Sequence, residues 1–373
     1  MKSENSKPYD YARLFLHDVP MLDVRAPIEF SKGAFPCSDN RPLMDDEQRA
    51  AIGTCYTKQG QDAAVTLGHE LINGALKQSR ITSWQDFIQQ HPEGMLYCFR
   101  GGMRSQITQQ WLQAAGTDFD FVPGGYKAMR RFLIDNLSQT CEPAANGGTP
   151  LRLISGRTGS GKTRVLYQLH RQVDLEGRAN HRGSAFGRMP GGQPSQINFE
   201  NQVSIDFLKH RANSTGSPIY IEDESRLVGS CYVPDCLQDA MKRSAMIVLE
   251  ASTQARTQLT VDDYVTNYWP ILQAEYGELA AEKFSEQFLG SLSRIKKRLG
   301  AERYTYIEGL FQSAISAFLE HGDADGFSEG FGLLLTQYYD PMYNYMLEKR
   351  QGDVIFRGSA EEVIEFANKN SQV

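Results

Sequence analysis

One stretch decides the fold of this chain: Met95–Ser105, with the sequence MLYCFRGGMRS. The apolar run Met95–Tyr97 predicts a short strand, and the helical spacing of the residues from Ser105 to Leu112 predicts a helix. A strand, a glycine-rich loop and a helix in that order are typical of a parallel α/β unit. The loop between the two elements carries one cysteine and two arginines.

Cys98 ends the predicted strand among residues that favour a thiolate. Only the thiolate of a cysteine is nucleophilic. Backbone N–H groups of a Gly101-Gly102 turn and the start of a following helix both stabilise an anion, and so do the guanidinium groups of Arg100 and Arg104. We therefore predict Cys98 as a catalytic nucleophile, with these four residues as its anion cradle. The structural alternative is a small buried hydrophobic residue, which is what most free cysteines are.

The cysteine loop resembles the active loop of the rhodanese family, and also that of the Cys-x5-Arg phosphatases built on the same fold. Leu22-Asp23-Val24-Arg25 matches a strand motif typical of rhodanese domains. In the usual single-domain sulfurtransferase the arginine comes one residue sooner than Arg104, so we expect a wider cradle here. Asp23 and Arg25 are predicted to form a structural ion pair, because most such pairs only fix loops.

Alternating strands and helices continue on both sides of this stretch. A helical pattern at 63–76 follows the glycine-bracketed loop 53–60, which either holds an anion at the helix start or is an ordinary turn. Residues 119–122 predict a strand and 126–137 a helix. We predict a rhodanese-like parallel α/β domain at 1–137 and, from the turn formers SQTCEPAANGGTP, a linker at 138–150.

A second motif follows the linker directly. Residues 156–163, GRTGSGKT, fit the pattern G-x-x-x-x-G-K-[ST] after a predicted strand at 151–155 and before a predicted helix at 164–172. In such a loop successive backbone N–H groups face a phosphate and the lysine neutralises its charge. The predicted phosphate-binding residues are Gly156, Thr158, Gly159, Ser160, Gly161, Lys162 and Thr163.

Thr163 can also hold Mg²⁺, which needs an acidic partner. The apolar run 218–221 leads into Glu222-Asp223-Glu224, as a strand ending in carboxylates does in a Walker B element. Adjacent side chains of a strand point to opposite faces, so only one of the first two acids can face the metal. We predict Asp223 as that residue, with Glu222 as the second choice.

Three groups of residues are candidates for binding substrate or RNA. The first is a loop at 180–188, where a substrate anion or an RNA phosphate is favoured over a solvated connection. The others are basic helix segments, whose alternative role is a solvated face. The residues are His181, Arg182 and Arg188 in the loop, and Lys127, Arg130, Arg131, Lys296, Lys297 and Arg298 in the helices. The aromatic run 338–345 is either core packing, the safer interpretation, or a set of base-stacking platforms.

Composition sets the remaining limits. The 373 residues exceed one core, and a P-loop α/β domain at 151–250 with a mainly helical region at 251–373 completes the domain prediction. In that region we expect helices at 263–276, 279–289 and 292–299, and a closing strand and helix at 354–356 and 361–368. The net charge of −6 argues against wholesale non-specific nucleic-acid binding. The six cysteines lack the paired spacing of a metal finger, so we predict that they are reduced thiols. No signal-peptide core or membrane-spanning run is present, so the cytoplasm is the expected location and no membrane partner is expected.

The whole chain resembles the bacterial tRNA 2-selenouridine synthase family, because the cysteine loop, the P-loop 156–163 and the loop 180–187 occur in the expected order. The resemblance implies a transferase that replaces the 2-thio sulfur of the wobble uridine in tRNA with selenium from selenophosphate. It also implies S-geranylation of that sulfur from geranyl diphosphate as an intermediate. The implied partners are the anticodon arm of tRNA and a selenophosphate-supplying enzyme, with Mg²⁺ and no permanently bound cofactor.

Two other classes of protein compete with this hypothesis. One is a Cys-x5-Arg phosphatase fused to a nucleotide-dependent kinase-like domain, although no acid for a leaving alkoxide is evident beside Cys98. The other is a non-enzymatic RNA-binding module, which would not require the cysteine loop.

Overall fold

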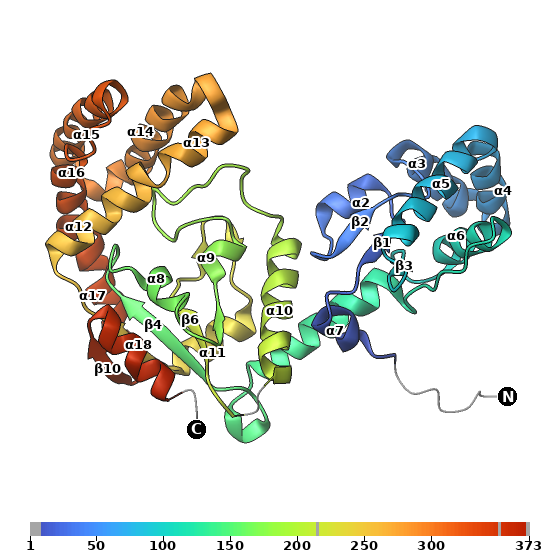
Figure 1. The fold of residues 1–373 in the computed structure, drawn as a ribbon, viewed down its shortest axis with the longest axis horizontal. Coiled ribbons are helices and arrows are strands. Elements are labelled where there is room, and N and C mark those ends of the chain that lie inside the picture. Colours follow the sequence, from blue (N-terminus) through green and yellow to red (C-terminus); the bar gives the residue numbers. More distant parts are fainter. Residues whose placement is uncertain (1–8, 214–215, 350–351, 371–373) are drawn as a thin grey trace. The chain divides into compact units, whose positions relative to one another are not determined.

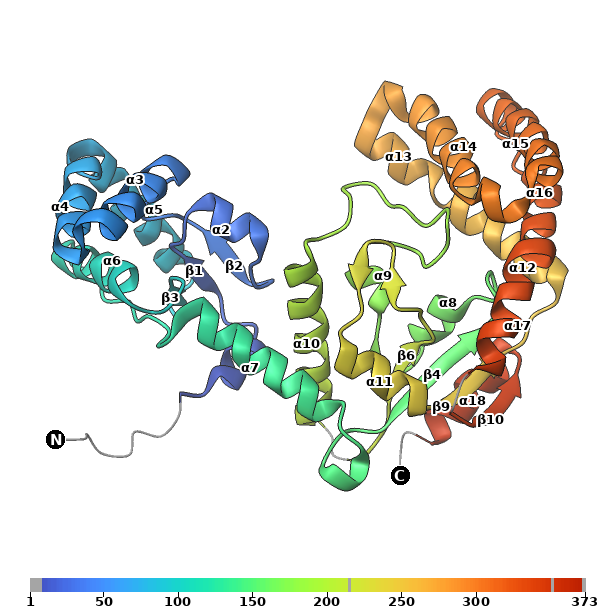
Figure 2. The same cartoon turned by 180° about the vertical axis from the view of Figure 1, so that it is seen from behind.

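The computed structural model describes residues 9–213, 216–349 and 352–370. The chain divides into two units (Figures 1 and 2). The first unit contains the residues up to Ser138 together with Ser195–Asn213, and the second contains Gln139–Pro194 and the residues after Asn213. Each unit has its own parallel sheet, so the α/β class predicted from the sequence is confirmed.

The sheet of the first unit has the strand order β2-β1-β3, with β1 at Met21–Asp23, β2 at Ser38–Asn40 and β3 at Met95–Tyr97. Both pairings are parallel. Successive side chains enter different cores, because they point to opposite faces of a strand. Leu22 and Leu96 join one hydrophobic cluster, and Met21 and Tyr97 join another.

Helices cover both faces of this sheet. Their bounds are α1 Tyr11–Leu16, α2 Pro27–Lys32, α3 Asp46–Gln59, α4 Gln61–Leu71, α5 Gly74–Gln90, α6 Met103–Ala114, α7 Gly125–Thr140 and α10 Gln196–Asn213. The predicted loop at 53–60 is wrong, since residues up to Gln59 belong to α3. A capping box at Asp45 and Gln48 starts that helix, and Gly60, with φ of 88°, ends it. The predicted strand at 119–122 amounts to one bridge between Leu96 and Phe121.

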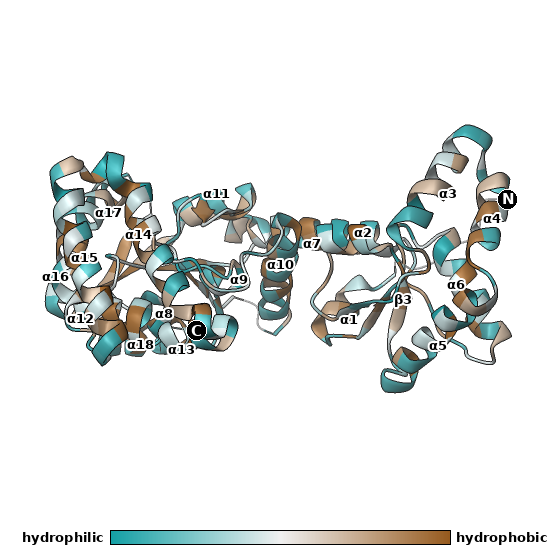
Figure 3. Ribbon diagram, turned by 90° about the horizontal axis from the view of Figure 1, so that it is seen from above, coloured by the Kyte–Doolittle hydropathy of each residue, from teal (hydrophilic) through white to brown (hydrophobic). Residues whose placement is uncertain are grey.

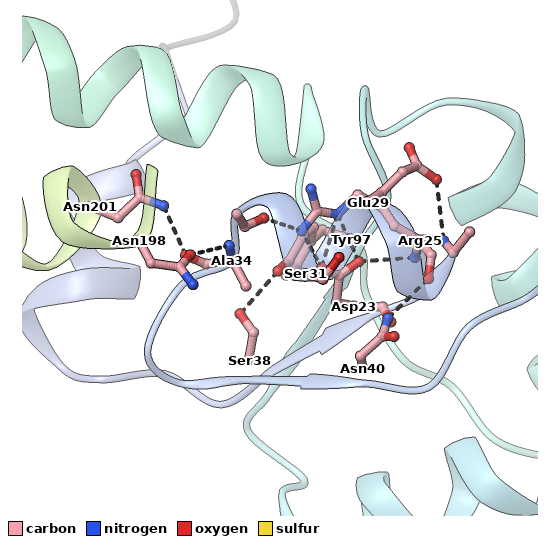
Figure 4. A network of polar contacts seen from close by, with 12 residues as sticks. Asp23, Arg25, Glu29, Ser31, Ala34, Ser38, Asn40, Tyr97, Asn198 and Asn201 are labelled. Carbon is pink, nitrogen blue, oxygen red and sulfur yellow. Dashed lines mark hydrogen bonds and ion pairs between the residues drawn. The ribbon is translucent and has the colours of Figure 1, made fainter. Parts of the chain in front are cut away.

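The predicted structural ion pair between Asp23 and Arg25 is confirmed (Figure 4). Arg25 Nη2 lies 2.6 Å from Asp23 Oδ2 and also donates to Gly33 O at 2.8 Å. Both side chains are buried, and the guanidinium lies 3.9 Å from the ring centroid of Tyr126. The pair therefore fixes the turn after β1 and does not face solvent.

Helix α10 is the main departure from the predicted domain boundaries. The sequence prediction assigns residues 195–213 to the P-loop domain, yet they pack in the first unit. Asn198 Oδ1 accepts from Ala34 N at 2.7 Å, and Asn201 Nδ2 donates to Ala34 O at 2.8 Å (Figure 4). Ile205 and Leu208 complete the cluster around Met21 and Tyr97.

The second unit is built on a five-stranded parallel sheet of order β10-β9-β4-β6-β5. Its strands are β4 Leu151–Gly156, β5 Gln172–Val173, β6 Ile219–Glu222, β9 Ala245–Leu249 and β10 Val354–Gly358. A small antiparallel pair, β7 Leu227–Val228 and β8 Cys231–Tyr232, lies apart from that sheet. The helices of the sheet region are α8 Lys162–Leu166, α9 Leu175–Arg178, α11 Asp235–Arg243 and α18 Ala360–Lys369.

The C-terminal region is mainly helical, as predicted. It contains α12 Thr253–Val261, η2 Asp262–Thr266, α13 Trp269–Tyr276, η3 Gly277–Leu279, α14 Ala280–Leu299, α15 Ala301–His321, α16 Phe327–Leu334, η4 Leu335–Tyr339 and α17 Asp340–Glu348. Hydrophobic and hydrophilic residues intermingle along α14 and α16 (Figure 3). The phenylalanines of α14, α15 and α16 pack together in one core, where Tyr338 is also buried.

Two sequence predictions fail in this unit. The helix after the P-loop ends at Leu166 and does not reach residue 172, because β5 begins there. The two helices expected at 279–289 and 292–299 are the single helix α14. The closing strand and helix expected at 354–356 and 361–368 are confirmed as β10 and α18. They belong to the P-loop sheet, where β10 pairs with β9 and α18 contributes Val363 and Ala367 to the core. At the predicted linker, α7 extends to Thr140 and a 3-10 turn, η1, occupies Ala144–Asn146.

Candidate active site

The cysteine loop is held tightly against the turn that starts α7. Tyr126 N donates to Cys98 O and Lys127 N donates to Phe99 O, each at 2.9 Å. Gly101 has φ of 59°, and a Cβ on it would lie 2.6 Å from Val122 O. A larger residue at this position would be strained and would collide with backbone, so glycine is required there.

Free backbone donors line the predicted anion cradle. Among the described residues, none accepts a hydrogen bond from the N–H groups of Arg100, Gly101 or Gly102. The first bond that closes α6 runs from Gln106 N to Gly102 O, so the N–H groups of the first turn of α6 are also available. Consecutive free N–H groups at a helix start form an anion-binding site.

The two arginines of the loop have different surroundings. Arg104 makes two bonds to Glu29, at 2.6 and 3.1 Å, so its charge is shared with that carboxylate. Burial opposes ionisation of Glu29, but the hydrogen bond and charge of Arg104 outweigh it and hold the pKa of Glu29 below its usual value. Arg100 is exposed, with its guanidinium 5.9 Å from the ring centroid of Phe99.

Cys98 is 3% exposed and belongs to a hydrophobic cluster with Trp111 and Leu112. Burial of Cys98 agrees with the alternative that it is a small hydrophobic core residue. The free N–H groups beside it agree with an anion-binding site. Ser105, which the sequence reasoning did not single out, is fully buried with a hydroxyl that has no hydrogen-bond partner. In the sequence, only its position directly after Arg104 could have marked Ser105 as a candidate site residue.

The P-loop has the conformation that its sequence demands. Gly159 and Gly161 have φ of 79° and 85°, and a Cβ on Gly159 would lie 2.6 Å from Thr260 Oγ1. No described residue accepts from the N–H groups of Gly159, Gly161 or Lys162. The buried Arg256 supports the loop by donating from Nε to Thr158 O at 2.9 Å, and its guanidinium is paired with Asp340.

The side chain beside Thr163 is Glu222, the second choice of metal ligand, and not Asp223, the first choice. Thr163 Oγ1 donates to Glu222 Oε1 at 2.5 Å. Asp223 instead accepts from Ser155 Oγ at 2.7 Å. The two acids point in different directions because strand residues alternate.

Glu176 and Glu224 join Glu222 in a cluster whose carboxylate oxygens lie within 4.8 Å of one another. Glu222 Oε2 is buried without a hydrogen-bond partner. Burial, followed by the charge of Glu176, raises the pKa of Glu222 to about 8. Burial also raises the pKa of Glu176 and Glu224. An unpaired buried carboxylate oxygen among like charges fits a divalent cation.

The loop at 180–188 lies partly on the P-loop cavity. His181 and Arg182 line that cavity, whereas Arg188 is exposed and does not. His181 is buried with an unpartnered Nδ1, and burial, together with the charges of Arg188 and Arg294, lowers its pKa. Phe186 anchors the loop in the helical core, with ring centroids 5.8 Å from Phe288 and Phe331.

The two basic segments differ in accessibility. Lys296, Lys297 and Arg298 are all exposed at the end of α14. In the other segment, Lys127 is exposed and Arg131 pairs with Asp135 on the same helix. Arg130 donates to Asn201 at 2.8 Å and pairs with Glu200, so it holds α10. Contact of Arg130 with RNA stays a prediction.

Comparison with known proteins adds to this geometry. Residues 149–373 match the family model described as "tRNA 2-selenouridine synthase AAA domain". The tRNA 2-selenouridine synthase of Marinobacter nauticus is 48% identical over 363 residues, 97% of each chain. That of Alcanivorax borkumensis is 47% identical over 360 residues, 96% of this chain and 98% of the relative. The chain belongs to the tRNA 2-selenouridine synthase family.

Similarity to tRNA 2-selenouridine synthases extends through both units, since these relatives match nearly the full chain. A solved N-terminal domain from Clostridium difficile 630, described as ATP/GTP binding, is 27% identical over 31% of this chain and 89% of that one, with a TM-score of 0.28. A similarity that weak has no bearing on the fold. Within the described ranges, none of the helices combines the length and hydropathy that a membrane span needs.

Proposed function

We propose that this chain converts wobble 2-thiouridine in tRNA to 2-selenouridine with selenophosphate, through an S-geranyl intermediate made from geranyl diphosphate. The proposal assigns alkylation of the sulfur to the P-loop of the second unit. It assigns replacement of the alkylated sulfur by selenium to the rhodanese-like first unit with its Cys98 loop.

The observation that carries the proposal is the composition of the P-loop cavity, which measures about 570 Å³. One end is formed by the loop from Gly156 to Thr163, whose N–H groups and lysine suit a diphosphate. The wall also contains apolar and aromatic side chains, namely Met189, Tyr264, Tyr339, Met342, Tyr343, Met346 and Leu347. A phosphate site beside an apolar wall matches an isoprenoid diphosphate.

A divalent cation fits the same cavity. Thr163 and Glu222 would hold Mg²⁺, with Glu176 and Glu224 within reach, and Asp223 remains outside this set because it bonds Ser155. The cation would supply positive charge to a departing pyrophosphate. Lys162 supplies a further positive charge at the loop, where its Nζ donates to Gly156 O at 3.2 Å.

Alkylation of the sulfur explains why one chain would carry both geranylation and selenation. Thiocarbonyl sulfur is a soft nucleophile but a poor leaving group. In the first step a sulfur–carbon bond forms, the carbon–oxygen bond to the diphosphate breaks, and the base loses its N3 proton. The resulting thioether can depart from C2 as a thiol.

In the second step Cys98 serves as the nucleophile. Its sulfur attacks C2 and the geranylthiolate leaves with a proton. Selenium of selenophosphate then attacks C2 and expels the Cys98 thiolate, and water cleaves the selenium–phosphorus bond to release phosphate. No oxidant or reductant is needed, and the free N–H groups of the Cys98 loop stabilise the anions involved.

The experiment that tests this division of labour uses Lys162→Ala. The variant should lose geranylation, and with it selenation of thio-tRNA, because the diphosphate then lacks the ammonium group that the P-loop directs at it. It should still selenate tRNA that is supplied already geranylated. Lys369→Ala, an exposed lysine of the same unit, is the matched control and should behave as wild type.

Two results would overturn the proposal. If the Lys162 variant fails to selenate pre-geranylated tRNA, the P-loop is not confined to alkylation. If selenation by the native protein requires ATP, the loop serves a nucleotide, as most such loops do. Assay on an aryl phosphate addresses the phosphatase alternative, which predicts turnover that depends on Cys98.

A further inference from the structure

The first unit contains a cavity of about 1190 Å³ that the P-loop chemistry does not use. It lies among α2, α3, α4, α6 and the Cys98 loop, and all its lining residues belong to the first unit. Much of the lining is aliphatic and aromatic. Its apolar residues include Met44, Ile52, Val65, Ile72, Ile107 and Trp111.

The cavity adjoins the cysteine loop directly. Phe99, Met103 and Arg104 of the loop and of the start of α6 line it. Phe99 and Met103 are each 37% exposed, so two large apolar side chains beside Cys98 are open to the cavity. Cys98 itself packs in the cluster that contains Ile107 and Trp111, two residues of the cavity wall.

The charged residues of the lining are mostly cations. Lys32, Arg49, Lys58 and Arg104 line the cavity, against the single carboxylate of Glu29. Arg25 also lines it, but its charge is already paired with that of Asp23. Glu29 is shared by Arg104 and Arg49, the latter at 3.1 Å. Lys32 and Lys58 are exposed and, among the described residues, neither forms an ion pair. Apolar walls with surplus positive charge complement a hydrocarbon group carried by a polyanion.

We propose that this cavity holds the hydrocarbon chain of the S-alkylated wobble base, while the surplus cations contact tRNA phosphates. The assignment rests on the proposed function, because that function makes the thioether the substrate of the Cys98 loop. The chain is then bound by both units in turn, as a diphosphate ester in the P-loop cavity and as a thioether beside Cys98. Binding of the leaving group beside the nucleophile orients C2 for attack.

Binding of free nucleosides tests the cavity apart from the chemistry. Calorimetric titration of the full chain with S-geranyl-2-thiouridine and with S-methyl-2-thiouridine should show at least ~100-fold tighter binding of the geranyl compound, given the apolar area it buries. Equal affinities would overturn the proposal, because the chain would then contribute nothing.

A carboxylate introduced into the cavity wall can be compared with one introduced beside it. Val65 lines the cavity and its neighbour Thr66 on α4 is exposed and does not. Val65→Glu should weaken binding of the geranyl nucleoside at least ~10-fold, because the hydrocarbon would desolvate a carboxylate. Thr66→Glu, with the same charge on the same helix, should bind within ~2-fold of wild type. Ile52→Glu on α3 repeats the test if the Val65 variant does not fold, as judged by circular dichroism.

Two enzyme assays separate this inference from the proposed function. Val65→Glu should slow selenation of pre-geranylated tRNA and leave geranylation of thio-tRNA unchanged. If wild type selenates pre-geranylated tRNA and both cavity variants do so equally well, the cavity assignment is wrong. If wild type binds the geranyl nucleoside but never converts geranylated tRNA, the proposed function fails and the binding site stands.

Discussion

At the scale of single residues, the two loops depend on backbone groups that few side chains disturb. Cys98 and Lys162 each lie beside several N–H groups without acceptors in the described structure. Glycines with positive φ keep those groups exposed, at Gly101 in one loop and at Gly159 and Gly161 in the other. These two candidate anion sites are therefore formed by backbone, so single side-chain substitutions can test the chemistry apart from folding.

The first prediction concerns Cys98→Ser. Serine is close in size to cysteine but is not ionised near neutral pH, so selenium incorporation should be abolished, by at least ~1000-fold. The melting temperature and tRNA binding should change little. Cys55→Ser, a thiol on α3 outside the cavity lining, is the control and should remain active. Full selenation by the Cys98 variant would remove this residue from the mechanism.

The second prediction concerns the pH dependence set by Glu222. Its pKa is about 8 in the folded protein and near 4.5 when solvated, so the folded state holds the proton more tightly. In chelator, stability should therefore fall as pH rises from about 5 to 8. Glu222→Gln should remove much of this dependence and raise the melting temperature at pH 8 by several degrees, at ~2–4 °C per kcal/mol.

The same measurement with added Mg²⁺ tests the metal site. Wild type at pH 8 should gain thermal stability, because the cation offsets the repulsion among Glu176, Glu222 and Glu224. Asp223→Asn should retain the gain and Glu222→Gln should lose it. A loss in the Asp223 variant alone would restore that residue as the metal ligand.

At the scale of elements, α14 and α7 present the two basic segments. The third prediction is that alanine at Lys296, Lys297 and Arg298 weakens tRNA binding and reduces the salt slope by about 2 to 3, since each lost phosphate contact removes ~0.7 to 0.9. Lys127 and Arg131 form the second test, with Arg130 retained because it holds α10. Lys242→Ala is a control for an exposed lysine of α11. Unchanged slopes in both variants would mean that the RNA docks elsewhere.

Sequence patterns predicted strands and helices correctly where the pattern depends only on residues close together in the chain. The strand at Met95–Tyr97, the helix α6 after it and the strand before the P-loop occur as predicted. The predicted loop at 53–60 is wrong because Gly53 lies within α3, which is capped at Asp45. The low helix propensity of a single glycine is a weak guide inside a helix. The break expected between residues 289 and 292 is wrong, because α14 packs into the same core on both sides of Gly290, through Phe288 before it and Leu292 after it.

At the scale of the whole molecule, the chain leaves the first unit and returns to it. Helix α10 contributes Ile205 and Leu208 to the core of the first unit from a position beyond the P-loop. The fourth prediction is that Asn201→Ala destabilises the first unit by about 1–3 kcal/mol, because Asn201 is fully buried and bonds Ala34 and Arg130. Asn213→Ala, at the exposed end of α10, should have no effect on thermal or denaturant unfolding. Equal stability of the two variants would contradict the assigned packing.

The sequence alone determined the Cys98 loop, the P-loop and the α/β class, because each loop depends on glycines and cations at fixed offsets within about ten residues. Tertiary structure alone decided which distant groups complete those loops. It brings Glu29 to Arg104, Glu176 to Glu222, α10 to the first unit and β10 to the edge of the P-loop sheet. Such contacts join residues far apart in the chain, and hydrophobic burial, which is not directional, selects them.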